Sequence, residues 1–202
     1  MHLHRLPVTV AVFAMTVALA ACGSDDSSSA DMTAALAETT DAPAGAVVLN
    51  DADIVFAQGM IAHHEQAIEM AEIALDPNRG ASPEVLDLAM RIKAAQDPEV
   101  DQMKAWLIAA GAPVTMDSSD GHDMSSMEGM MSAEQMDSMA MMSGAEFDRM
   151  WLEMMIEHHM GAISQSETVK AEGSNPGVLA LADRIITAQQ AEITEMEALL
   201  QN

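Results

Sequence analysis

The chain has 202 residues, and its 32 Asp and Glu against 8 Lys and Arg give a formal net charge of −24. Half of the residues are hydrophobic, which excludes wholesale disorder and allows a sizeable core. The negative charge argues against nucleic acid as a partner, because binding to phosphates requires a basic surface.

Residues 1–21 are predicted to be a lipoprotein signal peptide. Arg5 supplies a positive start, and the apolar run from Leu6 to Ala18 is too short to span a membrane securely. The run ends in Leu-Ala-Ala-Cys at Cys22, which resembles the lipobox of bacterial lipoproteins, where the cysteine is lipidated and begins the mature chain. The alternative is an ordinary signal peptide cut nearby, with Cys22 as a spare thiol.

Residues 22–50 are predicted to be a disordered tether, since they begin with a run of Gly, Ser and Asp that cannot bury itself. The folded part is therefore expected outside the cytoplasm, lipid-anchored to the cell membrane. A single cysteine excludes an internal disulfide in that compartment.

The remaining chain, 51–202, contains the same pattern twice. At a spacing of 95 residues, His63-His64 matches His158-His159, and a second segment beginning at Pro83 repeats from Pro176 at a spacing of 93. A duplicated pair of helices explains both spacings. Other matched pairs are Asp53 with Asp148, Phe56 with Trp151, Met60 with Met155, Gln96 with Gln189, and Glu99 with Glu192.

Apolar residues recur in steps of three and four in each repeated segment, which predicts helices with one buried face. Ser82-Pro83 and Asn175-Pro176 are typical helix starts, in which a capping residue precedes a proline of the first turn. We expect helices at about 52–75, 83–109, 145–171 and 177–201. The short turns make each pair antiparallel, so the fold class is all-α, a four-helix bundle built from two duplicated hairpins.

Each copy carries a Met-Ile-x-His-His motif, with Met60, His63 and His64 in the first and Met155, His158 and His159 in the second. Residues three apart share a helix face, so each methionine neighbours the first histidine of its pair. Di-iron bundles have Glu-x-x-His here, whereas a thioether suits a soft monovalent ion such as Cu(I). We expect the two pairs to face one another, with Gln96 and Gln189 orienting the rings. Hydrogen-bonded core histidines with methionine as filler are the alternative.

The segment 112–143 connects the two halves and is rich in methionine. Nine methionines lie between 116 and 142, some at three-residue spacing, while other large apolar residues are almost absent. We expect a flexible loop up to Ser132, followed by a short helix. Candidate secondary metal ligands are His122, Met124, Met127, Met130, Met136, Met139 and Met142. An adaptable contact surface or a linker without a task are the alternatives.

The repeated Asp-x-x-aromatic and Met-Ile-x-His-His-x-x-Ala-Ile pattern, with the Gln-x-x-Glu-x-x-x-Met series at Gln96 and Gln189, resembles the domain-of-unknown-function 305 family over about residues 51–202. The resemblance implies a helical, ferritin-like fold. It also implies kinship with CopM-like extracytoplasmic copper-binding proteins, with the two Met/His motifs as candidate copper ligands.

The sequence therefore predicts a membrane-tethered extracytoplasmic protein that captures copper, as Cu(I), through Met/His sites for copper tolerance or buffering. A copper-transfer protein is a candidate partner, and no catalytic residues are expected. The alternatives are a metal-independent envelope stress or interaction module, in which the histidines form a pH-sensitive core, and a metal-dependent oxidoreductase.

Overall fold

The computed structural model describes residues 47–116 and 127–201, and all regular structure within them is helical. The all-α prediction is thus confirmed, and each predicted long helix agrees with the structure to within a few residues. The predicted signal peptide and most of the predicted tether lie outside the described residues. The elements are α1 (Asp51–Leu75), the short 3₁₀ helix η1 (Pro77–Arg79), α2 (Pro83–Ala110), α3 (Ala133–Met141), α4 (Ala145–Glu172) and α5 (Pro176–Leu199).

The predicted capping residues begin their helices. Ser82 and Asn175 each accept hydrogen bonds from backbone N–H groups of the following turn, and a proline follows each of them as the first helical residue. Ser132 caps α3, so the short helix expected after the methionine-rich loop is present. None of the described helices combines the length and hydrophobicity needed to cross a bilayer.

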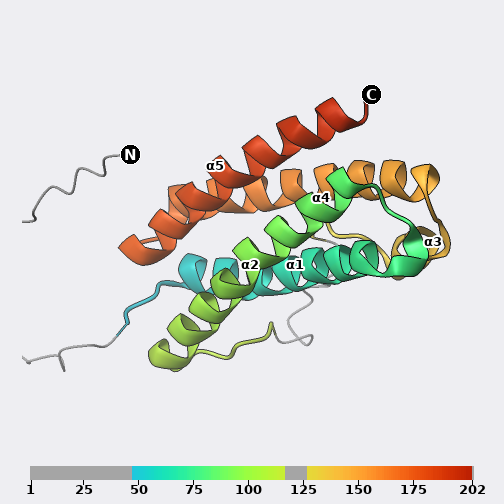
Figure 1. The fold of residues 1–202 in the computed structure, drawn as a ribbon. Helices are drawn as coiled ribbons and strands as arrows, with labels where there is room; N and C mark the ends of the chain where they lie inside the picture. Colours follow the sequence, from blue (N-terminus) through green and yellow to red (C-terminus); the bar gives the residue numbers. More distant parts are fainter. Residues whose placement is uncertain (1–46, 117–126, 202) are drawn as a thin grey trace, which may run out of the picture. The chain divides into compact units, whose positions relative to one another are not determined.

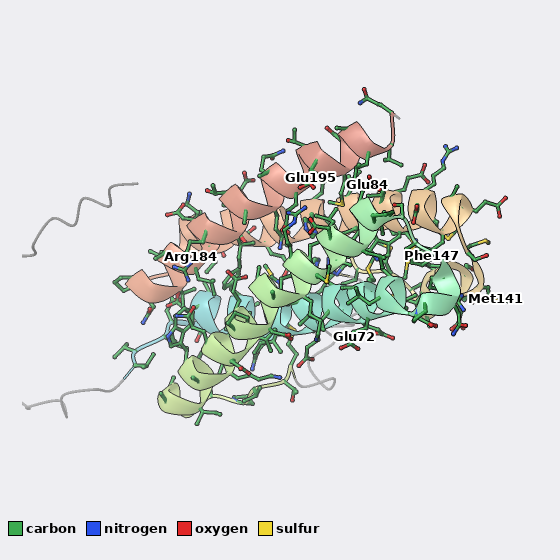
Figure 2. All side chains as sticks on the ribbon, in the orientation of Figure 1. Glu72, Glu84, Met141, Phe147, Arg184 and Glu195 are labelled. Atoms are coloured by element: carbon green, nitrogen blue, oxygen red, sulfur yellow. The ribbon has the colours of Figure 1, made fainter. Side chains whose placement is uncertain are left out.

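The helices form two antiparallel hairpins, α1 with α2 and α4 with α5 (Figure 1). The hairpins meet mainly through α1 and α4, which also run antiparallel. Trp151 Nε1, near the start of α4, donates a hydrogen bond at 2.9 Å to the carbonyl of Met70, near the end of α1. Helix α3 lies at the end where α1 finishes and α4 begins (Figure 1). At that end Phe147 is buried, whereas Met141 is 83% exposed (Figure 2).

Two aspartates join the hairpins in an equivalent way. The Asp53 carboxylate on α1 accepts hydrogen bonds from the backbone N–H groups of Ser174 and Asn175 in the α4–α5 turn, at 3.1 Å each. The matched Asp148 on α4 accepts from the backbone N–H of Ser82, at the start of α2, at 3.1 Å. Each hairpin thus stabilises the turn of the other, which fixes how far α1 and α4 slide along one another.

The core is divided into two apolar clusters. On α1, Phe56 to Ile61 belong to one cluster and Ala67 to Ala74 to the other. The other three long helices divide between the same clusters. The residues at the division are polar: His63, His64, Gln96, Glu99, His158, His159, Gln189 and Glu192. We call this set the histidine layer.

Candidate metal centre

His63 of α1 and His158 of α4 stack on one another inside the histidine layer. Their ring centroids are 3.8 Å apart and their planes are tilted by 45°. Both residues are 0% exposed. The prediction that the two repeated pairs face one another is confirmed for these two rings.

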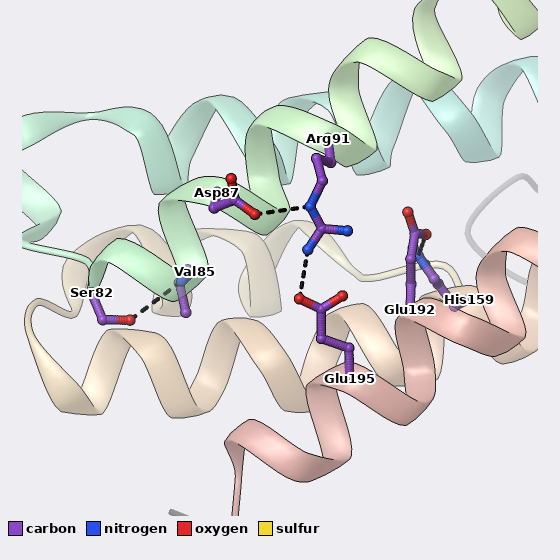
Figure 3. Close-up of polar contacts among 7 residues, drawn as sticks. All are labelled: Ser82, Val85, Asp87, Arg91, His159, Glu192 and Glu195. Atoms are coloured by element: carbon purple, nitrogen blue, oxygen red, sulfur yellow. Dashed lines mark hydrogen bonds and ion pairs between the residues drawn. The ribbon is translucent and has the colours of Figure 1, made fainter.

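The second histidine of each pair points to the other helix of its own hairpin. His64 Nε2 lies 2.9 Å from Glu99 Oε2 of α2, and His159 Nε2 lies 2.7 Å from Glu192 Oε2 of α5 (Figure 3). Both rings are fully buried, while the two carboxylates are partly exposed. An ionised carboxylate only accepts hydrogen bonds, so Nε2 is the donor in both contacts, while Nδ1 of each ring has no hydrogen-bond partner.

The prediction that Gln96 and Gln189 orient the rings is wrong. The amide oxygens of both glutamines are buried without a hydrogen-bond partner, and the carboxylates one turn further along hold the rings. The repeat contained the signal, because Glu99 and Glu192 match in both copies. Spacing alone could not decide between them, since residues three apart share one helix face.

The histidine layer contains eight buried nitrogen or oxygen atoms that lack a hydrogen-bond partner. They are both ring nitrogens of His63 and of His158, Nδ1 of His64 and of His159, and Oε1 of Gln96 and of Gln189. Leaving such an atom unsatisfied costs about 1–3 kcal/mol. Each neutral imidazole has one nitrogen lone pair, so a metal ion that binds it would recover part of this cost.

The two stacked histidines are neutral at physiological pH. Burial lowers the pKa of His63 to about 3, with a further lowering by the nearby His64. Burial also lowers the pKa of His158 well below its usual value, and the His63 ring adds to this shift. A neutral imidazole can bind a metal ion, whereas a protonated one cannot.

The methionines of the repeated motif lie in the apolar clusters. Met60 and Met155 are 0% exposed and belong to different clusters. Among the described residues, no three His, Cys, Asp or Glu side chains converge as a ready-made metal site. A site in this layer would therefore draw on thioethers as well, or on movement of the rings.

The methionine-rich segment divides into several environments. Met136 and Met139 of α3 are buried in the cluster around Trp151, and Met142 packs against it. Met127 and Met130 are partly buried, and Met127 Sδ lies near Gly59 of α1. His122 and Met124 fall outside the described residues, as does the proposed lipidation site, Cys22.

The model of the family described as domain of unknown function 305, DUF305, matches residues 53–200, which include the whole histidine layer. The chain belongs to the DUF305 family. No curated protein matches it by sequence.

Solved structures of the family have the same fold. A DUF305 protein from Streptomyces coelicolor, described as secreted, is 28% identical with a TM-score of 0.68, and the match covers 74% of this chain and 92% of that one. A DUF305 fragment from Deinococcus radiodurans is 30% identical with a TM-score of 0.67, over 75% and 97% of the two chains. CopM in its Cu(II)-bound form is 33% identical with a TM-score of 0.61, over 74% and 96%. CopM has also been solved with Cu(I) and with silver.

The lowered pKa values predict that the metal-free protein loses stability as the pH falls. The unfolded chain takes up protons on His63 and His158 below about pH 6.5, whereas the folded chain does not, so acid favours unfolding. Each such proton changes the free energy of unfolding by about 1.4 kcal/mol per pH unit. The free energy of unfolding of the metal-free protein can be measured with urea at several pH values between 5 and 6.5. It should change less steeply with pH in the His63→Leu variant than in wild type, by the equivalent of about one proton. Equal slopes would contradict the burial of a neutral His63.

Proposed function

We propose that this protein captures copper, as Cu(I), outside the cytoplasm, and so buffers copper or contributes to copper tolerance. The observation that carries this proposal is the histidine layer, in which buried, neutral imidazoles have nitrogens without a partner inside the protein. The candidate ligands are His63, His64, His158 and His159, together with thioethers. The ion is cargo, and no catalytic residue is assigned.

The donor chemistry fits a soft ion better than a hard one. Di-iron bundles carry glutamate three residues before the histidine, and this chain has Met60 and Met155 at those positions. Imidazole and thioether are ligands that Cu(I) favours. Thioethers also remain usable outside the cytoplasm, where thiols form disulfides. The net charge of −24 attracts cations in general, so affinity and selectivity, not binding alone, distinguish a site.

The relatives support copper over other ions. CopM, at 32–33% identity over most of both chains, has been solved with Cu(I), Cu(II) and silver. Silver(I) is a soft monovalent ion like Cu(I), which agrees with the donor set of this chain. A metal-independent module with a pH-sensitive histidine core remains the competing function, because the lowered pKa values of His63 and His158 are expected in either case.

A competition titration distinguishes these functions. We expect the protein to withdraw Cu(I) from a chromophoric chelator with a saturating stoichiometry, and to compete poorly for Zn(II). Substituting His63, His64, His158 and His159 by alanine should abolish the tight binding. Retained tight binding in that variant would move the site to the methionine-rich segment. Weak binding that wild type and variant share would leave the metal-independent function.

The membrane anchor is a separate part of the proposal. Cys22 in its Leu-Ala-Ala-Cys context supports lipidation, and the secreted description of the Streptomyces relative agrees with an extracytoplasmic location. In a bacterial host that processes lipoproteins, the wild-type protein should fractionate with membranes. The Cys22→Ser variant should lose this association and remain unprocessed or soluble. Membrane association that survives the substitution would contradict lipid anchoring through Cys22.

A further inference from the structure

The middle of the methionine-rich segment is hydrogen-bonded to both α1 and α4. Gln66 of α1 makes two hydrogen bonds to the backbone of Met131. Gln66 Nε2 donates to the Met131 carbonyl at 2.8 Å, and the Met131 N–H donates to Gln66 Oε1 at 2.7 Å. Ser164 of α4 donates to Glu128 Oε2 at 2.8 Å. We call residues 127–131 the strap.

Two glycines bring the strap backbone against α4 near His158. A Cβ atom on Gly161, three residues after His158, would lie 2.0 Å from the Glu128 carbonyl oxygen. Gly129 in the strap has φ +82°, a conformation that favours glycine, and its own Cβ would lie 2.9 Å from the His158 carbonyl oxygen. The strap therefore lies in direct contact with the helix that carries His158.

A third glycine, Gly59 of α1, lies beneath two thioether side chains. A Cβ atom there would lie 3.2 Å from Met116 Cε and 3.5 Å from Met127 Sδ, with Gln165 Oε1 at 3.3 Å. Met116 comes from the segment after α2, which Gln58 of α1 holds by donating to the Pro113 carbonyl at 2.7 Å. The two methionines thus approach the same point on α1 from different parts of the connecting segment.

That point lies one helical turn before His63, on the same face of α1. Both ring nitrogens of His63 lack a hydrogen-bond partner. The strap backbone lies against the turn of α4 that begins at His158, and the His158 ring lies 3.8 Å from the His63 ring, centroid to centroid. The strap therefore brings the Met127 thioether close to the pair of buried rings.

We infer that the thioether ligands of the copper site are Met116 and Met127, which join His63 to form a site of two sulfurs and one nitrogen. This inference rests on the proposed function and identifies the ligands of the same site. It replaces Met60 as the sulfur donor, because Met60 is fully buried in an apolar cluster with Phe56 and Met103.

The two halves of the bundle differ at this position. The residue that matches Gly59 in the second half is Met154, and its side chain belongs to the apolar cluster around Trp151. At this position the second half thus has a large side chain in place of the glycine that the two thioethers approach on α1. Among the described residues, the inferred site therefore has no counterpart at the matching position of α4.

Paired substitutions test which methionines bind the ion. Met116→Leu/Met127→Leu removes two thioethers with little change in volume, and Met60→Leu/Met155→Leu is the matched control with the same chemical change. Purified full-length wild type and both variants are loaded with Cu(I), and X-ray absorption spectroscopy reports the sulfur and nitrogen neighbours of the ion. Competition with a chelator gives the affinity, and far-UV circular dichroism confirms that each variant is folded.

We expect Met116→Leu/Met127→Leu to lose its sulfur neighbours and to bind Cu(I) at least about tenfold more weakly, the lower end of what loss of a supporting partner costs a metal site. The control should keep both the sulfur neighbours and the affinity. If the wild type binds Cu(I) and Met116→Leu/Met127→Leu retains its sulfur neighbours, the assignment of these ligands is overturned while the proposed function stands. If the wild type does not bind Cu(I) tightly, the proposed function itself fails.

Discussion

Burying four imidazoles between two apolar clusters costs free energy, and the rest of the bundle is arranged around that constraint. Two of the rings, His64 and His159, gain a carboxylate partner from the neighbouring helix. The other two, His63 and His158, stack at 3.8 Å with unpartnered nitrogens. Each unsatisfied atom costs about 1–3 kcal/mol, a large fraction of the net stability of a domain. A soft metal ion that binds nitrogen lone pairs in this layer would remove part of that cost.

The surrounding structure holds the layer in register. Asp53 and Asp148 each bind the turn of the opposite hairpin, and these contacts set the position of α1 along α4. Because side chains one turn apart occupy different layers of the bundle, this register decides that His63 meets His158 and not an apolar neighbour. Glu99 and Glu192 fix the orientation of the His64 and His159 rings through their Nε2 atoms, which leaves Nδ1 of each ring without a partner inside the layer.

Local features of the sequence were sufficient to predict the helices and their caps, because apolar spacing and residues such as Ser82 and Asn175 act over a few positions. The side-by-side arrangement of His63 and His158 followed from the repeated motif. The identity of the orienting residues did not, because Gln96 and Glu99 share a helix face and only the rotation of α2 against α1 decides which one reaches His64. The roles of the methionines in the connecting segment could not be predicted either. Met136 and Met139 are core residues, whereas Met127 lies beside a glycine on α1, and nothing in the composition of the segment distinguishes them.

The most direct test of the account is whether a soft ion enters the histidine layer at all. Silver(I) is redox-silent and diamagnetic, so the protein labelled with ¹⁵N in its histidine rings can be followed by NMR as silver is added. The account predicts that a ring nitrogen of His63 shifts along a saturating curve as silver is added, and that the His63→Leu variant loses this response. Ring nitrogens that do not respond while silver binds elsewhere would contradict a metal centre in the histidine layer.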